Sequence, residues 1–301
     1  MNKLSFCVAD VEFSLLFMDI PDARHLLPSY APFHIQRPNE SNCIMQMTIE
    51  NGRERYESEG LMVGDFDCGD SFYTISRLPN NDYKILISNI QREPACALHT
   101  NADFSICDAT LFGDDNMQQF GLGNAIMLTF AFSAAKHGVL LMHASVIAYE
   151  NEAYLFLGKS GTGKSTHSSL WQKFIPGSEL LNDDNPAVRY FPNGEIMVYG
   201  TPWSGKTPCY RNKKYPAGAF VRLKQAPHNI IQKENKIKAF ASILSSCSTM
   251  MWDKGSYDNI LNNVSETIRN TPVFFLQCRP DEEAANLCHK TITRHEVKEV
   301  K

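Results

Sequence analysis

The sequence lacks both a strong charge of either sign and a recognisable export signal. Its 29 lysines and arginines against 33 aspartates and glutamates give a net charge of −4, and the basic residues form no run. Such a mildly acidic chain disfavours nucleic acid and anionic membrane surfaces as partners. The first residues also lack the apolar stretch and the small-residue cleavage site of a secretory signal. We therefore expect a cytoplasmic protein that binds neither nucleic acid nor membrane.

The sequence also lacks an uninterrupted apolar segment long enough to span a bilayer. The most apolar region, residues 122–142, approaches that length but is interrupted by Asn124, Lys136 and His137. Charged and polar side chains are costly inside a membrane. Gly138 further divides the region into a helix-like half and a strand-like half. We interpret the region as buried core.

Several motifs of common enzyme classes are absent. The nine cysteines are odd in number and no two stand in a C-x-x-C arrangement, which disfavours a disulfide framework and a structural zinc site. No two histidines have the H-x-x-x-H spacing of zinc hydrolases. The guanine-binding N-K-x-D motif and the L-S-G-G-Q motif of ABC-type transporters are missing as well. These absences argue against a zinc hydrolase, a translation-type GTPase and a transport ATPase.

The expected strands and helices divide the sequence into two parts, the first rich in strands and the second alternating strands with helices. Residues 1–115 are rich in strand-like runs separated by turn residues. These runs are residues 4–17, 43–50, 72–77 and 83–90, with a turn at 79–82. A helical stretch over about 117–137 follows. Beyond it, expected strands at 139–149, 153–157, 180–182, 187–191, 195–199, 218–223 and 273–276 alternate with expected helices up to Trp171, at 236–246, at 257–268 and at the C-terminus.

This order of expected strands and helices predicts an α/β (α+β) protein of two domains. A smaller β-rich N-terminal domain would comprise residues 1–115, and a catalytic domain would comprise residues 116–301. The Gly113-Asp114-Asp115-Asn116 segment marks the boundary.

Residues 158–166 match the phosphate-binding pattern G-x-x-x-x-G-K-[ST], known as Walker A. Glycines allow positive φ and let backbone N–H groups close around phosphate oxygens. A helix after the loop directs its N-terminus at the same anion. Lys164 would neutralise the β- and γ-phosphates of ATP, and the Ser165 hydroxyl would bind Mg²⁺. The residues expected to contact the nucleotide are Gly158, Ser160, Gly161, Thr162, Gly163, Lys164, Ser165 and Thr166.

Two carboxylates follow an apolar run about twenty residues after Lys164. Asp183 and Asp184 come directly after Leu180-Leu181-Asn182. In phosphoryl transfer, one carboxylate can hold Mg²⁺ while the other accepts the proton of an attacking hydroxyl. A polar turn before Pro186 is the alternative interpretation. Next to a phosphate loop, we favour the functional interpretation.

His143, the glycine-rich loop and the aspartate pair together resemble the catalytic domain of HPr kinase/phosphorylase. Residues 160–166 and the aspartate pair are also similar to the two kinase motifs of ATP-dependent phosphoenolpyruvate carboxykinase, a family with a related nucleotide-binding core. The resemblance covers about residues 138–210. It implies a P-loop core of mixed sheet with flanking helices, and it implies a homo-oligomer, since HPr kinases assemble into rings. It further implies that Asp183 is the acid/base, that His143 tunes it, and that Asp184 is associated with Mg²⁺.

The chain departs from HPr kinases at two places. Thr166 stands where those enzymes usually have glutamate, and the block Gly200-Thr201-Pro202-Trp203-Ser204-Gly205-Lys206-Thr207-Pro208 replaces their downstream signature. This block is similar to one in uncharacterised HPr-kinase-like proteins, so HPr itself is not indicated as the substrate. Its Lys206 either touches phosphate from a closing loop or is a solvated lysine beside a core tryptophan. Arg211 has the same two interpretations, with solvation favoured.

The resemblance and the residues lead to one functional prediction. We expect a Mg²⁺-dependent kinase that transfers the γ-phosphoryl group of ATP to a hydroxyl group, such as a serine of a protein, a peptide or a small molecule. Lys164 would neutralise charge and Asp183 would act as base. A non-catalytic nucleotide sensor is the alternative, and a carboxykinase-like enzyme ranks third. The presence of both aspartates favours catalysis, because a sensor does not need a base.

Overall fold

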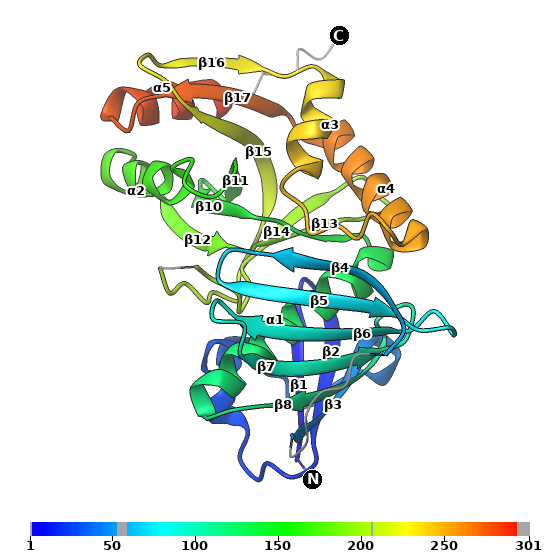
Figure 1. Ribbon diagram of the computed structural model, residues 1–301. Helices are drawn as coiled ribbons and strands as arrows, with labels where there is room; N and C mark the ends of the chain where they lie inside the picture. Colours follow the sequence, from blue (N-terminus) through cyan, green and yellow to red (C-terminus); the bar gives the residue numbers. More distant parts are fainter. Residues whose placement is uncertain (1, 53–58, 206, 294–301) are drawn as a thin grey trace. The chain divides into compact units, whose positions relative to one another are not determined.

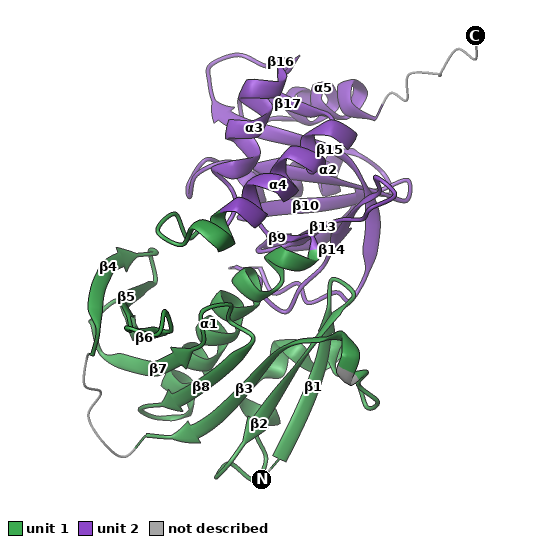
Figure 2. Ribbon diagram, turned by 90° about the vertical axis from the view of Figure 1, so that its right-hand side faces the viewer, with its two compact units in different colours: residues 1–137, 250–257 green, residues 138–249, 258–301 purple. Residues whose placement is uncertain are grey.

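The computed structural model describes residues 2–52, 59–205 and 207–293 of the 301-residue chain (Figure 1). These residues form two compact units, coloured separately in Figure 2. Unit 1 comprises residues 1–137 and 250–257, and unit 2 comprises residues 138–249 and 258–301. None of the helices described in either unit combines the length and the apolar character that crossing a bilayer requires.

Unit 1 is a mixed eight-stranded sheet with a long helix, α1, against one face (Figure 2). The strand order is β1-β2-β3-β8-β7-β6-β5-β4. Strand β3 runs parallel to both of its neighbours, and the other pairs are antiparallel. The elements are β1 (Asn2–Val8), β2 (Val11–Phe17), β3 (Cys43–Asn51), β4 (Leu61–Asp67), β5 (Ser71–Arg77), β6 (Tyr83–Asn89), β7 (Pro94–Thr100), β8 (Ile106–Leu111), α1 (Asp115–Ser133) and the 3-10 turns η1 (Arg24–Leu26), η2 (Pro28–Phe33) and η3 (Glu40–Asn42).

The core of unit 1 lies between this sheet and α1. Alternate residues of β2 point to one face, and Phe13, Leu15 and Phe17 are fully buried there. The ring of Phe13 lies 5.9 Å from the ring of Phe130 of α1. Helix α1 begins at the Asp114 carboxylate, which accepts a hydrogen bond from the Met117 N–H at 3.0 Å. The helix therefore confirms the expectation of a buried helical stretch in this region.

The predicted hairpin in unit 1 is confirmed, but one long predicted strand is wrong. Strands β5 and β6 pair antiparallel around the expected turn, where the N–H of Leu78 donates to the carbonyl of Asp82 at 2.8 Å. The expected single run at residues 4–17 is instead two antiparallel strands. They are joined at Ala9 and Asp10, both at positive φ (54° and 56°). Since neither residue is a glycine, the turn carries no strong sequence signal.

Unit 2 contains a second mixed sheet, in the order β12-β10-β11-β15-β14-β13-β9, to which β17 and β16 add beside β15. The strands are β9 (Val139–Leu141), β10 (Ala144–Tyr149), β11 (Glu152–Leu157), β12 (Glu179–Asp184), β13 (Ala187–Tyr190), β14 (Ile196–Tyr199), β15 (Lys214–Gln225), β16 (Ile230–Lys233) and β17 (Val273–Cys278). The helices are α2 (Lys164–Phe174), α3 (Lys236–Leu244), α4 (Lys254–Asn270), of which unit 2 holds the residues from Asp258 on, and α5 (Glu282–Ile292).

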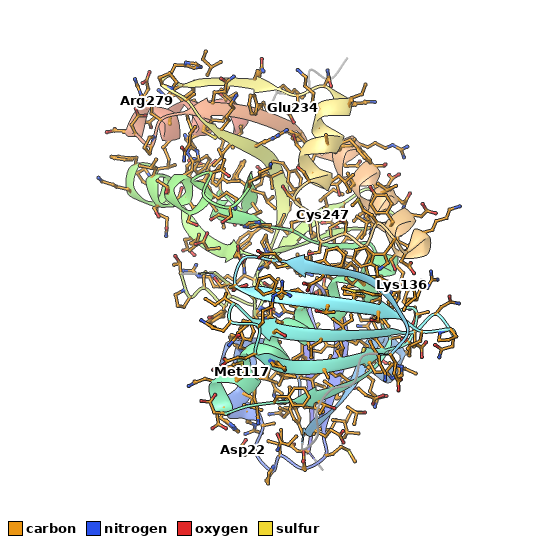
Figure 3. The ribbon with its side chains drawn as sticks, in the orientation of Figure 1. Asp22, Met117, Lys136, Glu234, Cys247 and Arg279 are labelled. Atoms are coloured by element: carbon orange, nitrogen blue, oxygen red, sulfur yellow. The ribbon has the colours of Figure 1, made fainter. Side chains whose placement is uncertain are left out.

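Helices α2 and α5 lie next to each other in unit 2 (Figure 1) and share one core with the sheet. Trp171 of α2 is fully buried, with its ring 5.6 Å from that of Phe156 in β11. Helix α5 begins at Asp281, whose carboxylate accepts from the Ala284 N–H at 2.9 Å. Arg279, labelled in Figure 3, forms ion pairs with Asp281 and with Glu283 at this helix start. The core and the caps thus fix the helices that flank the sheet.

The predicted helices of unit 2 are confirmed within a few residues, as is the last strand. The expected run at residues 139–149 is wrong as a single strand. It breaks between Leu141 and Ala144, because β9 pairs with β13 while β10 pairs with β11 and β12. Strand β16 was not expected. The protein is therefore a mixed α/β structure with two mixed sheets and few helices. The predicted domain boundary near residue 115 coincides with the start of α1, which belongs to unit 1, and it stays a prediction.

Candidate functional site

Three of the predicted motifs meet at one edge of the unit 2 sheet. Strand β10 lies between β11 and β12 and runs antiparallel to both. Its first residue, Ala144, pairs with Leu157 at the end of β11 and with Asp184 at the end of β12. His143 directly precedes that row, and Gly158 directly follows it. The strand pairing therefore brings His143, the phosphate loop and the aspartate pair together, although Asp184 follows His143 by 41 residues in sequence.

Backbone contacts with Ser246 and Cys247 also hold the chain around His143 at this edge of the sheet. The His143 N–H donates to the carbonyl of Ser246 at 2.7 Å. The preceding residue, Met142, forms an isolated bridge with Cys247, which is labelled in Figure 3. These contacts follow the break between β9 and β10. They fix the backbone at Met142 and at the His143 N–H, directly before β10.

The phosphate loop leaves an open space beside the start of α2. Gly161 and Gly163 have φ of 78° and 100°, a region that favours glycine. A Cβ built on either glycine would meet no atom within 4 Å. The exposed side chains around this space are Ser160, Ser165 and Thr166. The Thr162 N–H donates to the Lys159 carbonyl at 3.1 Å, which closes the turn of the loop.

Helix α2 begins without the side-chain cap that α1, α3 and α5 have. Asp114, Asn235 and Asp281 cap α1, α3 and α5 with a side-chain oxygen. Gly163, at the same position of α2, has no side chain to do so. The first N–H groups of a helix have no partner within the helix, and those of α2 bond no acceptor in the described part of the chain. This arrangement offers free donors and a positive dipole end to an anion.

The Lys164 side chain is folded into the loop. Its Nζ donates to the carbonyls of Gly158 at 3.0 Å and Lys159 at 3.4 Å, and the residue is only 8% exposed. Burial lowers the pKa of the Lys164 ammonium, while the charges of Asp184 and Asp183 raise it. The lysine is thus close enough to both carboxylates to feel their charge, as well as being part of the phosphate loop.

The two aspartates have different surroundings. Asp183 is buried at 5% exposure, whereas Asp184 is partly exposed. The Nε2 atom of His143 lies 3.2 Å from Oδ1 of Asp184. The other oxygen of Asp184 accepts from the side-chain amide of Asn185 at 2.7 Å. The imidazole predicted to tune Asp183 therefore contacts its neighbour, Asp184.

The block after Gly200 runs along the aspartate pair. The Gly205 N–H donates to the Asp183 carbonyl at 2.6 Å, and Ser204 forms an isolated bridge with Asp184. Trp203 is buried at 7% exposure, as expected for a core tryptophan. Lys206 lies outside the described residues.

Arg211 lies away from this edge. Its guanidinium pairs with Glu179, at the opposite end of β12 from the aspartates, at 2.7 Å.

Some neighbours of the site carry no motif and were not expected. The Gln225 amide donates to the Gly161 carbonyl at 3.2 Å, because β15 extends three residues beyond its pairing with the last residue of β11. The hydroxyls of Ser145 and Ser168 lie 2.6 Å apart and join β10 to α2 in the core. The contact between Gln225 and Gly161 could have been expected only from the parallel pairing of β11 with β15.

The available donors fit a nucleotide-bound Mg²⁺ better than a resident metal centre. No group of three or more His, Cys, Asp or Glu side chains suited to a metal occurs within the described ranges. The Ser165 hydroxyl and the carboxylates of Asp183 and Asp184 supply oxygen atoms, the ligands that Mg²⁺ prefers. Magnesium commonly takes one or two protein carboxylates and completes its shell with phosphate and water. These residues therefore fit Mg²⁺ that arrives with a nucleotide.

Comparison with known proteins adds little to this geometry. No protein-family model and no curated protein matches the chain. Among solved structures, the chain is similar to the HPr(Ser) kinase/phosphatase from Coxiella burnetii, with a TM-score of 0.30 and 13% sequence identity. The similarity covers 50% of this chain and 86% of that one. A likeness this weak carries no argument about activity.

Proposed function

We propose that the protein is a Mg²⁺-dependent phosphotransferase of the HPr-kinase-like type, built on a P-loop core in unit 2. It would transfer the γ-phosphoryl group of ATP to a hydroxyl group, with a serine of a protein, a peptide or a small molecule as the acceptor. The observation that carries the proposal is the meeting of the phosphate loop, Asp183 and Asp184 at one sheet edge through the Ala144 row. The sequence resemblance to HPr kinases supports the same conclusion.

Phosphate binding would use the loop and the start of α2. The uncapped N–H groups after Gly163 would donate to phosphate oxygens. Lys164 would leave the carbonyls of Gly158 and Lys159 and pair with the β- and γ-phosphates. The Gln225 amide would hold the Gly161 carbonyl outward, away from the anion. The loop would thereby present donors, and few acceptors, to the phosphates.

Phosphoryl transfer would use the buried carboxylate as base. The acceptor hydroxyl oxygen forms a bond to the γ-phosphorus, the bond from that phosphorus to the bridging oxygen breaks, and ADP leaves. The hydroxyl proton passes to the Asp183 carboxylate, which acts as the general base. Ser165 and Asp184 would hold Mg²⁺, which supplies positive charge at the phosphates when bound. His143 would orient the Asp184 carboxylate, as second partners of metal ligands commonly do.

The test is transfer of labelled γ-phosphate from ATP in the presence of Mg²⁺. The acceptors are a cell lysate, HPr and free serine, and the proteins are wild type, Lys164→Ala and Asp183→Asn. Labelling by the wild type alone supports the proposal and identifies the acceptor class. If both wild type and Asp183→Asn bind ATP but neither labels an acceptor nor hydrolyses ATP, the protein is a nucleotide sensor and the proposal is wrong.

A further inference from the structure

The hydroxyl group of Thr201 lies at the centre of a buried polar network. Thr201 and Asn182 are both completely buried. The Thr201 Oγ1 atom accepts from the side-chain amide of Asn182 at 3.1 Å and from the N–H of Trp203 at 3.2 Å. It donates its own proton to the carbonyl of Asn185 at 2.6 Å. One hydroxyl thus satisfies three partners, which is its full capacity of one donated and two accepted hydrogen bonds.

These partners flank the two aspartates on both sides. Asn182 directly precedes Asp183, and Asn185 directly follows Asp184. The Asn182 amide also donates to the Trp203 carbonyl at 3.1 Å. The segment that contains the aspartates is therefore tied at each end to Thr201 and its loop. The tie runs through backbone and amide groups and does not use either carboxylate.

A second set of contacts joins the same loop to the aspartates themselves. The Gly205 N–H donates to the Asp183 carbonyl at 2.6 Å, and the Ser204 hydroxyl lies between that carbonyl, at 3.1 Å, and the Thr207 carbonyl, at 2.6 Å. A Cβ on Gly205 would lie 3.2 Å from that carbonyl oxygen and 3.2 Å from the Cβ of Asp184. Such an approach is tighter than most Cβ contacts, so a glycine suits the position. The loop therefore lies directly against the backbone of the pair.

The backbone of Asp184 also needs external support. Its φ is 140°, in a region that side-chain-bearing residues rarely adopt. Such conformations cost free energy and persist only where surrounding contacts enforce them. The contacts that surround it here are the pairing of Asp184 with Ala144, its bridge with Ser204, the Thr201 hydrogen bond to the Asn185 carbonyl, and the Gly205 contact. If they are removed, we expect the Asp184 carboxylate to turn away from its present direction.

We propose that Thr201 is a positioning residue that sets the geometry of Asp183 and Asp184 from the loop of residues 200–205. The purpose of that geometry rests on the function proposed above, whereas the positioning itself does not. The inference also gives a physical reason for part of the Gly200–Pro208 block. Thr201 supplies the hydroxyl, and Gly205 permits the close approach.

The test compares Thr201→Val, which keeps the shape and removes the hydroxyl, with Thr201→Ser, which keeps the hydroxyl. Thr267→Val is the matched control, because Thr267 is equally buried and its hydroxyl donates only to the Asn263 carbonyl of its own helix, at 2.8 Å. Three quantities are measured for each protein. They are ATP turnover with Mg²⁺, the affinity for metal-free nucleotide, and the affinity of the nucleotide complex for Mn²⁺ by water proton relaxation.

We expect Thr201→Val to weaken Mn²⁺ binding and turnover by about ten- to a hundred-fold, the usual effect of losing a partner that orients a metal ligand. Its affinity for metal-free nucleotide should not change, because the phosphate loop is untouched. Thr201→Ser and Thr267→Val should behave as the wild type. If Thr201→Val behaves as Thr267→Val in all three measurements, the inference is wrong.

Two further outcomes are covered by the design. If the wild type shows no turnover, the proposed function fails, and the Mn²⁺ affinities of the variants still decide the positioning role. If Thr201→Val does not fold by circular dichroism, Gly205→Ala takes its place, since the added Cβ presses on Asp183 and Asp184. Reduced Mn²⁺ affinity with unchanged nucleotide affinity in Gly205→Ala supports the inference, and unchanged Mn²⁺ affinity overturns it.

Discussion

Replacing Lys164 by alanine should weaken nucleotide binding without unfolding the protein. At about 4 Å and an effective dielectric constant of about 20, a lysine attracts one phosphate charge by about 4 kcal/mol. In the free protein, however, Lys164 already donates to two loop carbonyls, the nearer at 3.0 Å. Hydrogen bonds from a charged donor stabilise by about 1.5–3 kcal/mol. The net gain on binding is then about 2 kcal/mol, or about a 30-fold change in Kd.

Lys159 provides the matched control for this prediction. It belongs to the same loop and carries the same charge, but its side chain is exposed. Exposed ion pairs contribute at most about 1 kcal/mol, so Lys159→Ala should weaken binding by less than about fivefold. Isothermal titration calorimetry at physiological ionic strength measures both variants, and urea unfolding verifies that each is folded. An equal loss of affinity in the two variants would refute the reasoning, because it would mean that only the net charge of the loop matters.

Three predictions concern the stability of the fold. Burial lowers the pKa of His167 to about 4, whereas in the unfolded chain the imidazole has a pKa of about 6.5. Below about pH 6.5 the unfolded chain therefore binds a proton that the folded protein does not, and the free energy of unfolding falls by about 2 kcal/mol from pH 7 to 5. Urea unfolding should show a smaller fall for His167→Gln, and an equal fall in the variant would contradict the role of His167. Ser145→Ala and Ser168→Ala should each cost about 1–2 kcal/mol by leaving a buried hydroxyl unpaired, and the double variant should cost less than their sum; strict additivity in denaturation would disprove the coupling. Asp10→Gly should raise the unfolding free energy by about 0.5–1 kcal/mol, since glycine adopts the positive φ of this position without strain; a lower midpoint in urea would show the turn conformation to be wrong.

The elements with local signals were predictable from the sequence. The turn at Pro79–Asp82 has several strong turn formers, and the α1 region ends before Gly138, which has a φ of 81°. The phosphate loop carries its own pattern of glycines followed by Lys164 and a helix. In each case the residues that decide the conformation are neighbours in the chain. Residue type and spacing are then sufficient.

The convergence of the site depends on pairing between distant strands, which no local pattern encodes. The buried run from Val139 to Tyr149 looks continuous, because both halves are apolar. Its break at Met142 and His143 arises only because β9 and β10 find different partners. The same pairing sends the imidazole to Asp184. Sequence reasoning identified these residues as a group but expected the histidine beside Asp183, whereas its imidazole contacts Asp184.

The Thr201 network illustrates the same limit. A threonine between Gly200 and Pro202 reads as an ordinary loop residue. Its hydroxyl is buried between Asn182 and Asn185, which are separated from it in the sequence by strands β13 and β14. Such contacts depend on tertiary packing, so only the structure reveals them.

The most direct test of the account is a crystal structure with Mg²⁺ and a non-hydrolysable ATP analogue. We predict phosphate oxygens on the N–H groups at the start of α2, with Lys164 Nζ moved from the Gly158 carbonyl to the phosphates. The metal should contact Ser165 and Asp184, and the Asp183 carboxylate should face the γ-phosphate. A nucleotide bound elsewhere, or a γ-phosphate out of reach of Asp183 with Lys164 still bonded to Gly158, would contradict the account.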